Sequence, residues 1–339
     1  MKKICVCSAQ TPFVRGGAEY LAESLASELK RRSHEVDAIQ LPLQTQPTEE
    51  IIKSCLAWRL IDLRQADIVI ATKFPSYMVA HRNKVIWLVH QLRGAYNLYG
   101  TRYSGFQKTA KDTRLREYLI DLDQQAFSEA KKIYTISKTI SARLKKHNGF
   151  DSIPLYPPLW DADQFRFDKA EDFVLSVCRL EADKRVDLLI EALQYVTGRC
   201  AAVIVGEGSM RKEWQQKAER LGVASRIRFA GQLPRNEVIE LYSRAGVVFY
   251  GPVDEDYGYA TIEAFSAGKP VITCDDSGGI LEFVDASSGW VAQPDPRRIA
   301  NAIDSALSNK AEAAARGESG HARIRDLNWD AVHRNLVES

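Results

Sequence analysis

The sequence lacks any apolar run as long as the ~20 residues that cross a bilayer as a helix, so no membrane span is expected. Its basic start is followed by an apolar stretch too short for a secretory signal peptide. The six cysteines show no paired spacing of the kind that binds zinc. We therefore expect free thiols in a reducing compartment and a cytoplasmic protein, with peripheral contact at the inner membrane face left open.

An excess of charge of one sign is also absent, since 46 Lys and Arg residues face 44 Asp and Glu residues and leave a formal net charge of +2. The halves differ, because residues 1–165 contain 24 basic and 17 acidic residues, whereas residues 166–339 contain 22 and 27. An acidic second half argues against nucleic acid as a partner. The basic first half suits an anionic acceptor, although solvated helix faces are the simpler explanation of charge alone.

At 339 residues the chain is too long for one ordinary hydrophobic core and suits two domains. Short apolar runs alternate with helical patterns, which is typical of a mostly parallel, doubly wound α/β sheet. In the first half we expect strands at 4–8, 36–41, 67–71, 85–90 and 133–136, and helices at 19–32, 51–64 and 115–129.

The same alternation restarts in the second half, which indicates a second Rossmann-like domain. We expect strands at 173–180, 202–205, 227–230, 247–250 and 271–273, and helices at 186–196, 210–221, 235–245, 260–267 and 297–307. The proline-rich segment 154–158 stiffens a linker between the halves. The expected domains are residues 1–156 and 157–321, followed by a C-terminal helix at 322–339.

Ligands of doubly wound sheets bind at the carboxyl edge of the strands, where this sequence places glycines and cations. Gly16 and Gly17 lie between the first strand and helix, but they do not form a Gly-x-Gly-x-x-Gly dinucleotide motif. In the second half, Arg179 ends a strand and Lys184 precedes a helix. Two cations at one edge suit a diphosphate, whereas ion pairs with the acidic neighbours are the alternative.

The stretch 252–272 is the most informative part of the chain. Glu255 and Glu263 are separated by seven residues, and Gly258 between them permits a tight turn. A helix is expected to begin just after this glycine, so that its first N–H groups face an anion. The residues that supply these groups are Tyr259, Ala260 and Thr261. N–H donors for phosphate and carboxylates for sugar hydroxyls together suit a nucleotide-sugar; an acidic helix start that merely complements the helix dipole is the alternative.

This stretch, continued by Ala267-Gly268-Lys269-Pro270, resembles the Glu-x7-Glu motif of the retaining nucleotide-sugar glycosyltransferases of family GT4. The resemblance covers nearly the whole chain and is densest in residues 173–296. It implies the GT-B fold, in which two Rossmann-like, doubly wound domains face each other across a cleft. In that family the C-terminal segment often returns to the first domain, which residues 322–339 would do here.

The resemblance also implies roles for individual residues. Glu255 would contact the donor sugar and Glu263 the ribose. The backbone that follows Gly258 would contact the diphosphate, as would Arg179 and Lys184. These cations would neutralise the charge that develops on the leaving nucleoside diphosphate. Gly16 and Gly17 would lie in a loop over the donor phosphates and the acceptor.

Three further positions leave alternatives open. Gly206 and Gly231 end strands whose edges form the base pocket in the family, although strand-to-helix turns explain such glycines equally well. His90 resembles a histidine near the donor sugar, but Gln91 replaces the usual aspartate, so a capping or packing role stays open. Many relatives have Lys-Gly where this chain has Lys184 followed by Arg185, which adds a surface charge or a phosphate contact.

Residues 96–116 combine aromatic and basic side chains, which suits contact with a glycan or a lipid-phosphate interface; a solvated loop and helix is the alternative. The residues concerned are Tyr99, Tyr103, Phe106, Arg102, Lys108, Lys111, Arg114 and Arg116. Asp275-Asp276 resembles a family loop that does not bind metal, and we recognise no Asp-x-Asp of the metal-dependent transferase type.

Together, the residues and the resemblance predict a retaining, metal-independent glycosyltransferase without a cofactor. It would move a hexose from a UDP- or GDP-sugar to a hydroxyl of a glycan or lipid-linked acceptor, with Arg179, Lys184, Glu255 and His90 as the catalytic residues. The alternatives are a sugar-nucleotide epimerase or a phosphorylase of the same fold, and a non-catalytic sugar-nucleotide-binding subunit. A phosphorylase would normally carry a cofactor lysine and a longer chain.

Overall fold

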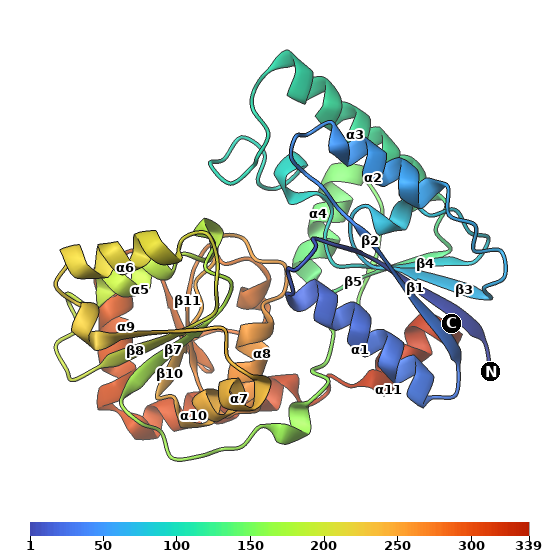
Figure 1. Cartoon of the computed structure of the whole chain (residues 1–339). Helices are drawn as coiled ribbons and strands as arrows, with labels where there is room; N and C mark the ends of the chain where they lie inside the picture. Colours follow the sequence, from blue (N-terminus) through green and yellow to red (C-terminus); the bar gives the residue numbers. More distant parts are fainter. Residues whose placement is uncertain (339) are drawn as a thin grey trace. The chain divides into compact units, whose positions relative to one another are not determined.

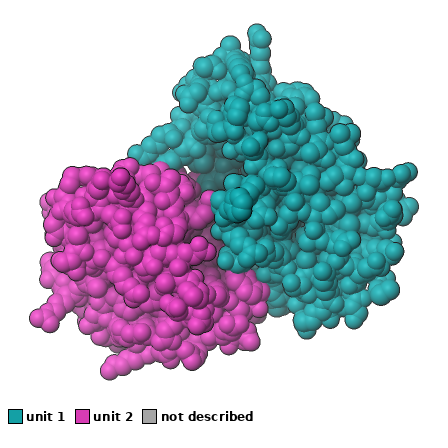
Figure 2. Space-filling view, viewed as in Figure 1, with its two compact units in different colours: residues 1–158, 327–339 teal, residues 159–326 magenta. Residues whose placement is uncertain are grey.

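The computed structural model describes residues 1–338 and divides the chain into two compact units (Figures 1 and 2). Unit 1 comprises residues 1–158 together with the C-terminal segment from Leu327, and unit 2 comprises Leu159–Asp326. Each unit is an α/β fold around its own six-stranded sheet, and the expected pair of doubly wound domains is confirmed. None of the helices in residues 1–338 combines the length and apolar character of a membrane span.

The sheet of unit 1 is parallel and has the strand order β2-β1-β3-β4-β5-β6. Its strands are β1 (Lys3–Gln10), β2 (Glu35–Pro42), β3 (Ile68–Ala71), β4 (Lys84–Leu88), β5 (Lys132–Thr135) and β6 (Ile153–Pro154). Every residue of β3 and β4 is buried, as expected for parallel strands covered on both faces. Because β4 ends at Leu88, His90 lies in the loop that follows and not in the strand predicted for 85–90.

The main helices of unit 1 are α1 (Gly17–Arg31), α2 (Glu50–Arg59), α3 (Ala110–Ser128) and α4 (Lys138–Asn148). The helix predicted for 51–64 ends at Arg59, and the one predicted from residue 115 begins at Ala110, where Thr109 caps it. The sequence prediction omits α4, although the Ser137 side chain caps its start and Gly149, with a φ of 77°, follows its end.

The sheet of unit 2 is also parallel and has the order β12-β11-β10-β7-β8-β9. Its strands are β7 (Phe173–Val177), β8 (Ala201–Val205), β9 (Ile227–Gly231), β10 (Val247–Phe249), β11 (Val271–Cys274) and β12 (Gly289–Ala292). This is the strand order of the Rossmann fold, which reverses direction between β7 and β10. The carboxyl ends of these two strands therefore mark the place where a ligand is expected.

The helices of unit 2 are α5 (Val186–Ala192), α6 (Arg211–Arg220), α7 (Arg235–Arg244), α8 (Tyr259–Ser266), α9 (Pro296–Ser308) and α10 (Lys310–Ile324). Two glycines let α10 pack directly against the end of α8. A Cβ at Gly317 would lie 1.9 Å from the carbonyl oxygen of Gly268, and one at Gly320 would lie 2.3 Å from the ring of Phe265. Close backbone packing therefore fixes the position of α8 in unit 2.

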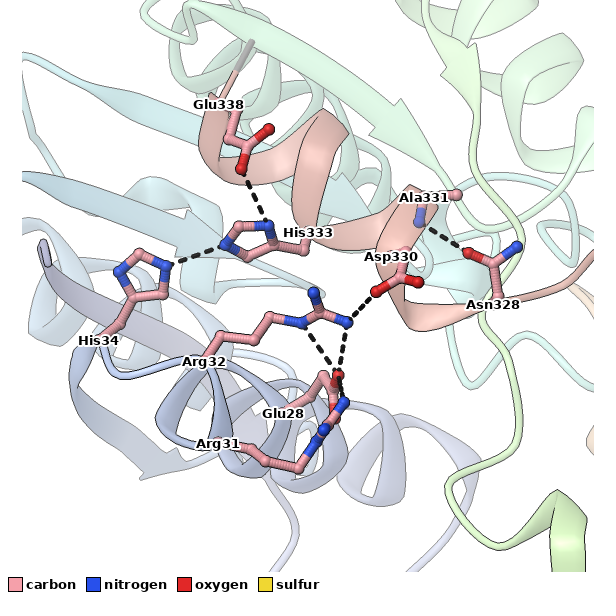
Figure 3. A network of polar contacts seen from close by, with 9 residues as sticks. All are labelled: Glu28, Arg31, Arg32, His34, Asn328, Asp330, Ala331, His333 and Glu338. Atoms are coloured by element: carbon pink, nitrogen blue, oxygen red, sulfur yellow. Dashed lines mark hydrogen bonds and ion pairs between the residues drawn. The ribbon is translucent and has the colours of Figure 1, made fainter.

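The C-terminal segment of unit 1 consists of α11 (Trp329–His333) and a π-helical turn (Arg334–Glu338), and Figure 3 shows the polar contacts that hold it. Arg32, just after α1, pairs with both Glu28 and Asp330. The Nε2 atoms of His34 and His333 lie 2.9 Å apart, and Nδ1 of His333 lies 3.4 Å from the Glu338 carboxylate. The chain end therefore contacts the turn between α1 and β2.

The hydrogen bonds of the His34–His333 pair assign one proton to each ring. His34 Nδ1 accepts the backbone N–H of Lys2 at 3.2 Å, so the proton of a neutral His34 lies on Nε2 and is donated to His333. His333 then carries its proton on Nδ1, toward Glu338. Burial, helped by the neighbouring His333, lowers the pKa of His34, and burial, helped by Arg32, lowers the pKa of His333.

This pair predicts sensitivity to acid. Because both pKa values are lowered in the folded state, the unfolded chain binds more protons on acidification. The stabilisation is therefore complete above the ordinary histidine pKa of about 6.5 and is lost as pH falls below it. Between about pH 7.5 and 5, scanning calorimetry should show the parent losing about 2–4 °C more in Tm than His333→Gln.

His81→Gln is the matched control for this prediction, because His81 also lies in unit 1 and hydrogen-bonds only the carbonyl of Ala66 and the N–H of Asn83 within the described chain. It should follow the parent. An equal loss in the parent and in His333→Gln would contradict the prediction.

Candidate active site

The loops that follow β7 and β10 meet at the switch point of the unit 2 sheet. The first loop carries Arg179 and Lys184, and the second carries Glu255 and leads into α8. The loop after β11 joins them, because Glu255 forms a parallel β-bridge with Gly278. The structure thus brings Lys184, Glu255 and the start of α8 to one edge of one sheet, as their positions in the sequence predict.

A shielded ion pair occupies this edge. Lys184 Nζ donates to Glu255 Oε2, and the hydroxyl of Tyr250 donates to the same oxygen at 3.0 Å. The side chains of Lys184 and Glu255 are only 9% and 13% exposed, so water screens their attraction less than that of a surface pair. Burial, reinforced by Glu255, raises the pKa of Tyr250, which keeps its hydroxyl a proton donor.

The start of α8 has the features of an anion site. Gly258 precedes the helix with a φ of 85°, and a Cβ there would lie 2.7 Å from Ile280 Cγ1, so this position requires glycine. Tyr259, Ala260 and Thr261 form the first turn, whose N–H groups start the helix dipole. Thr261 is fully buried, and its hydroxyl has no hydrogen-bond partner among residues 1–338. The N–H of Thr261 already donates to the carbonyl of Gly258 at 2.9 Å, so the N–H groups of Tyr259 and Ala260 and the Thr261 hydroxyl are the donors that suit phosphate oxygens.

Glu263, on α8, belongs to a second charged cluster. Arg235 of α7 donates from Nη1 to Glu263 Oε1 at 2.5 Å and from Nε to Asp161 at 2.7 Å. The guanidinium of Arg235 also lies 4.9 Å from the ring centre of Trp160. Burial raises the pKa of the Glu263 carboxyl, and the charge of Arg235 opposes that shift. Arg235 therefore both anchors Glu263 and favours its ionised form.

The two arginines of the β7 loop differ in their surroundings. Arg179 is exposed, and its side chain makes no hydrogen bond or ion pair with any other residue in 1–338. Arg185 is 7% exposed, and its guanidinium donates to Asp276 and to backbone carbonyls. The expectation that Arg185 adds a surface charge is wrong, because its N–H groups are engaged by acceptors inside the protein.

Of the two glycines predicted for a base pocket, Gly206 follows β8 and Gly231 ends β9. The N–H of Gly206 donates to the carbonyl of Gly231 at 2.8 Å, and both residues have positive φ angles, of 129° and 72°. A Cβ on Gly206 would lie 1.9 Å from the carbonyl oxygen of Cys178. Backbone packing requires glycine at 206, and the base-pocket role stays a prediction.

The remaining predicted residues lie in unit 1. The N–H of Gly16 donates to Glu19 at 2.9 Å, which caps α1, and Gly17 is the first residue of that helix. His90 Nδ1 lies 2.7 Å from the carbonyl oxygen of Gln91, whose own side chain is buried. The roles of these residues near donor and acceptor stay predictions.

The aromatic and basic segment 96–116 is partly engaged in internal contacts. Arg116 lies over the ring of Tyr99, 4.4 Å from its centre, and Lys111 pairs with Glu49. The exposed cations of the segment are Arg102, Lys108, Lys111 and Arg114. Contact with an acceptor or a lipid surface stays a prediction for these residues.

Asp-x-Asp triplets occur at 121–123, 161–163 and 254–256. Two of their carboxylates accept hydrogen bonds from protein donors. Asp123 is fully buried and accepts hydrogen bonds from the hydroxyls of Tyr77 and Tyr96, while Asp161 accepts from Arg235. Within residues 1–338, no group of three or more His, Cys, Asp or Glu side chains is placed to hold a metal ion.

Sequence reasoning missed three residues of the unit 2 site: Tyr250, Arg235 and Asp161. It assigned Asp276 to a family loop but did not pair it with Arg185. Tyr250 had a usable signal, since it follows the strand that leads to Glu255. Arg235 and Asp161 are separated by 73 intervening positions, and only the packing of the chain brings them together.

The second unit can be compared with known families. Residues 161–323 match the sequence model of the family described as Glycosyl transferases group 1. This match spans nearly the whole of unit 2, Leu159–Asp326. The chain is 24% identical to an uncharacterized glycosyltransferase of Methanocaldococcus jannaschii, over 91% of this chain and 90% of that protein.

Solved structures agree on the fold. Alr3699/HepE of Anabaena, in complex with UDP and glucose, is 17% identical with a TM-score of 0.75, covering 100% of this chain and 99% of that one. Sucrose-phosphate synthase from Thermosynechococcus elongatus is 19% identical with a TM-score of 0.77, covering 100% and 98%. The chain therefore has the GT-B fold that the resemblance implies.

Proposed function

We propose that this protein is a glycosyltransferase that moves a hexose from a UDP- or GDP-sugar to a hydroxyl of a glycan or lipid-linked acceptor, with retention of configuration and without a metal ion. The observation that carries the proposal is the Lys184–Glu255 pair directly before the start of α8. It joins a cation, a carboxylate and helix N–H groups at the switch point of a Rossmann-like sheet, which is the set that a sugar diphosphate requires.

The diphosphate would lie at the start of α8, against Arg179 and Lys184. Arg179 is exposed at this edge and makes no ion pair within residues 1–338, so its guanidinium is available to a ligand. Lys184 has three N–H donors and can contact a phosphate oxygen while it keeps Glu255. These fixed positive groups would supply the charge stabilisation that Mg²⁺ supplies in other transferases.

The two glutamates would hold the two ends of the donor. Glu255 would accept hydrogen bonds from the sugar hydroxyls, and Glu263, anchored by Arg235, would accept from the ribose. In the reaction, the bond between the sugar C1 and the diphosphate oxygen breaks through an oxocarbenium-like state. The acceptor oxygen attacks C1 from the same face, and its proton passes to the leaving diphosphate.

A UDP-sugar is the first donor to test, because the similar structure of Alr3699/HepE contains UDP and glucose. The acceptor would use unit 1, where Gly16 and Gly17 open α1 and where the exposed cations of segment 96–116 lie. Epimerase, phosphorylase and purely binding activities of the same fold are the competing outcomes of a product assay.

Product analysis tests the reaction itself. With UDP- and GDP-hexoses and an acceptor mixture, proton NMR should show a new glycosidic bond with the anomeric configuration of the donor. Turnover should survive excess EDTA, because protein groups neutralise the diphosphate. An inverted product would overturn the retaining assignment, and activity abolished by EDTA and restored by Mg²⁺ or Mn²⁺ would overturn metal independence.

Substitution of Arg179 tests the diphosphate site. Arg179→Ala should lower kcat about 10²-fold, the scale for losing one transition-state donor, and should leave the circular dichroism spectrum unchanged. Arg220→Ala is the matched control, since Arg220 is an exposed arginine at the far end of α6, whose start lies on the site's edge of the sheet. Parental turnover by Arg179→Ala would remove this residue from the site.

A further inference from the structure

Arg185 combines a backbone conformation that favours glycine with a buried charge. Its φ and ψ angles are 50° and 39°, in the left-handed region that costs side-chain-bearing residues energy. Its side chain is 9% exposed although arginine is rarely buried without partners. Asp254, in the loop that follows β10, also has a positive φ, of 46°. Strained backbone of this kind persists only where surrounding contacts hold it.

The contacts of Arg185 reach two loops at once. Its Nε donates to the carbonyl of Gly251 at 2.8 Å, and its Nη2 donates to the carbonyl of Pro252 at 2.9 Å. Its Nη1 donates to Asp276 Oδ2 at 2.8 Å, and Nη2 donates to Oδ1 at 2.5 Å. Four hydrogen bonds therefore join the β7 loop to the loops that follow β10 and β11.

The backbone of the Glu255 loop, which follows β10, is also tied to the loops that follow β7 and β11. The N–H of Val253 donates to the carbonyl of Asp183 at 2.8 Å, and the N–H of Asp254 donates to the carbonyl of Asp276 at 2.9 Å. The N–H of Glu255 donates to Ser277 at 3.2 Å, and its carbonyl accepts from Gly279 at 2.7 Å. The side chain of Arg185 contacts the same group of loops, and the acceptors of its four hydrogen bonds named above are protein oxygens.

We propose that Arg185 is a positioning residue: it fixes the loop 251–256 so that the Glu255 carboxylate stays between Lys184, Tyr250 and the donor sugar. The proposal rests on the function proposed above for Glu255. The guanidinium suits this task because its planar fork binds one carboxylate and two carbonyls in a fixed geometry, which a lysine ammonium does not reproduce. Asp276 supplies the counter-charge that makes its burial tolerable.

Arg185→Gly separates positioning from general stability. Glycine adopts the same φ without strain, while the four hydrogen bonds of the guanidinium are lost. We expect kcat for transfer from a UDP-hexose to fall about 10²-fold, the cost of a small misplacement of a reacting group. The Kd for UDP, measured by calorimetry, should stay within about twofold, since Glu255 holds the sugar and not the nucleotide. Arg185→Lys should recover part of the lost kcat.

The matched control is Arg244→Ala, which removes an exposed arginine that pairs with Glu171 at the surface of unit 2. It should leave kcat and Kd unchanged. Parental kcat in Arg185→Gly would overturn the proposal, as would a loss of kcat that follows a loss of folded protein in a thermal melt. A raised Kd for UDP with unchanged kcat would instead place Arg185 on the nucleotide and equally overturn it.

Hydrogen exchange on the ligand-free protein keeps this test separate from the proposed function. Arg185→Gly should speed amide exchange in residues 251–256 and 275–279, and Arg244→Ala should not. Unchanged amide exchange in these segments would refute the positioning role of Arg185 even if the enzyme transfers sugar. The parent could bind no nucleotide while amide exchange in these segments is still faster in Arg185→Gly. In that case the function proposed above fails, but the role of Arg185 in fixing the loop 251–256 is supported.

Discussion

The site in unit 2 depends on keeping an ammonium and a carboxylate together in a place where water screens them little. A buried ion pair repays its desolvation only if further hydrogen bonds satisfy both charges, and removal of one partner typically costs about 3–5 kcal/mol. Glu255 meets this condition with the hydroxyl of Tyr250 and the N–H of Asp256, besides Lys184 itself. The three strand-end loops are tied together by backbone bonds that make this possible.

The topology of the unit 2 sheet explains why the site lies at this edge. Reversal of the strand order between β7 and β10 separates their following helices and leaves room between the two loops. α8 then starts directly after Gly258, and the glycine contacts of α10 hold the other end of that helix. A nucleotide-sugar would meet positive groups at its diphosphate and carboxylates at its hydroxyls, without rearrangement of the sheet.

Much of the fold and of the unit 2 site was predictable from the sequence, because hydrophobic periodicity and turn residues are local signals. Strands such as β8 and helices such as α8 fall within a residue or two of their predicted bounds. Glu255, Gly258 and Glu263 occur in one short stretch, so their placement follows from one strand, one turn and one helix. The family resemblance then supplied the roles, which the contacts alone do not assign.

The charge pairings of Arg185 and Arg235 could not be predicted, because they depend on contacts between distant parts of the chain. Arg185 looked like a surface charge, since nothing in its neighbourhood shows that Asp276 will face it. Arg235 likewise gives no sign that it will bridge Asp161 and Glu263. α4 was missed although its caps were readable, because its apolar positions, Ile140 and Leu144, are few.

In the function proposed above, one edge of the unit 2 sheet would bind the two ends of a nucleotide-sugar through two different glutamates. Calorimetric titration of UDP into the parent, Glu255→Gln and Glu263→Gln tests it most directly. Glu263→Gln should weaken UDP binding at least about tenfold, because the ribose loses a charged acceptor, whereas Glu255→Gln should bind UDP like the parent and lose turnover. Equal weakening of UDP binding in both variants, or weakening only in Glu255→Gln, would contradict this division of roles between the two glutamates.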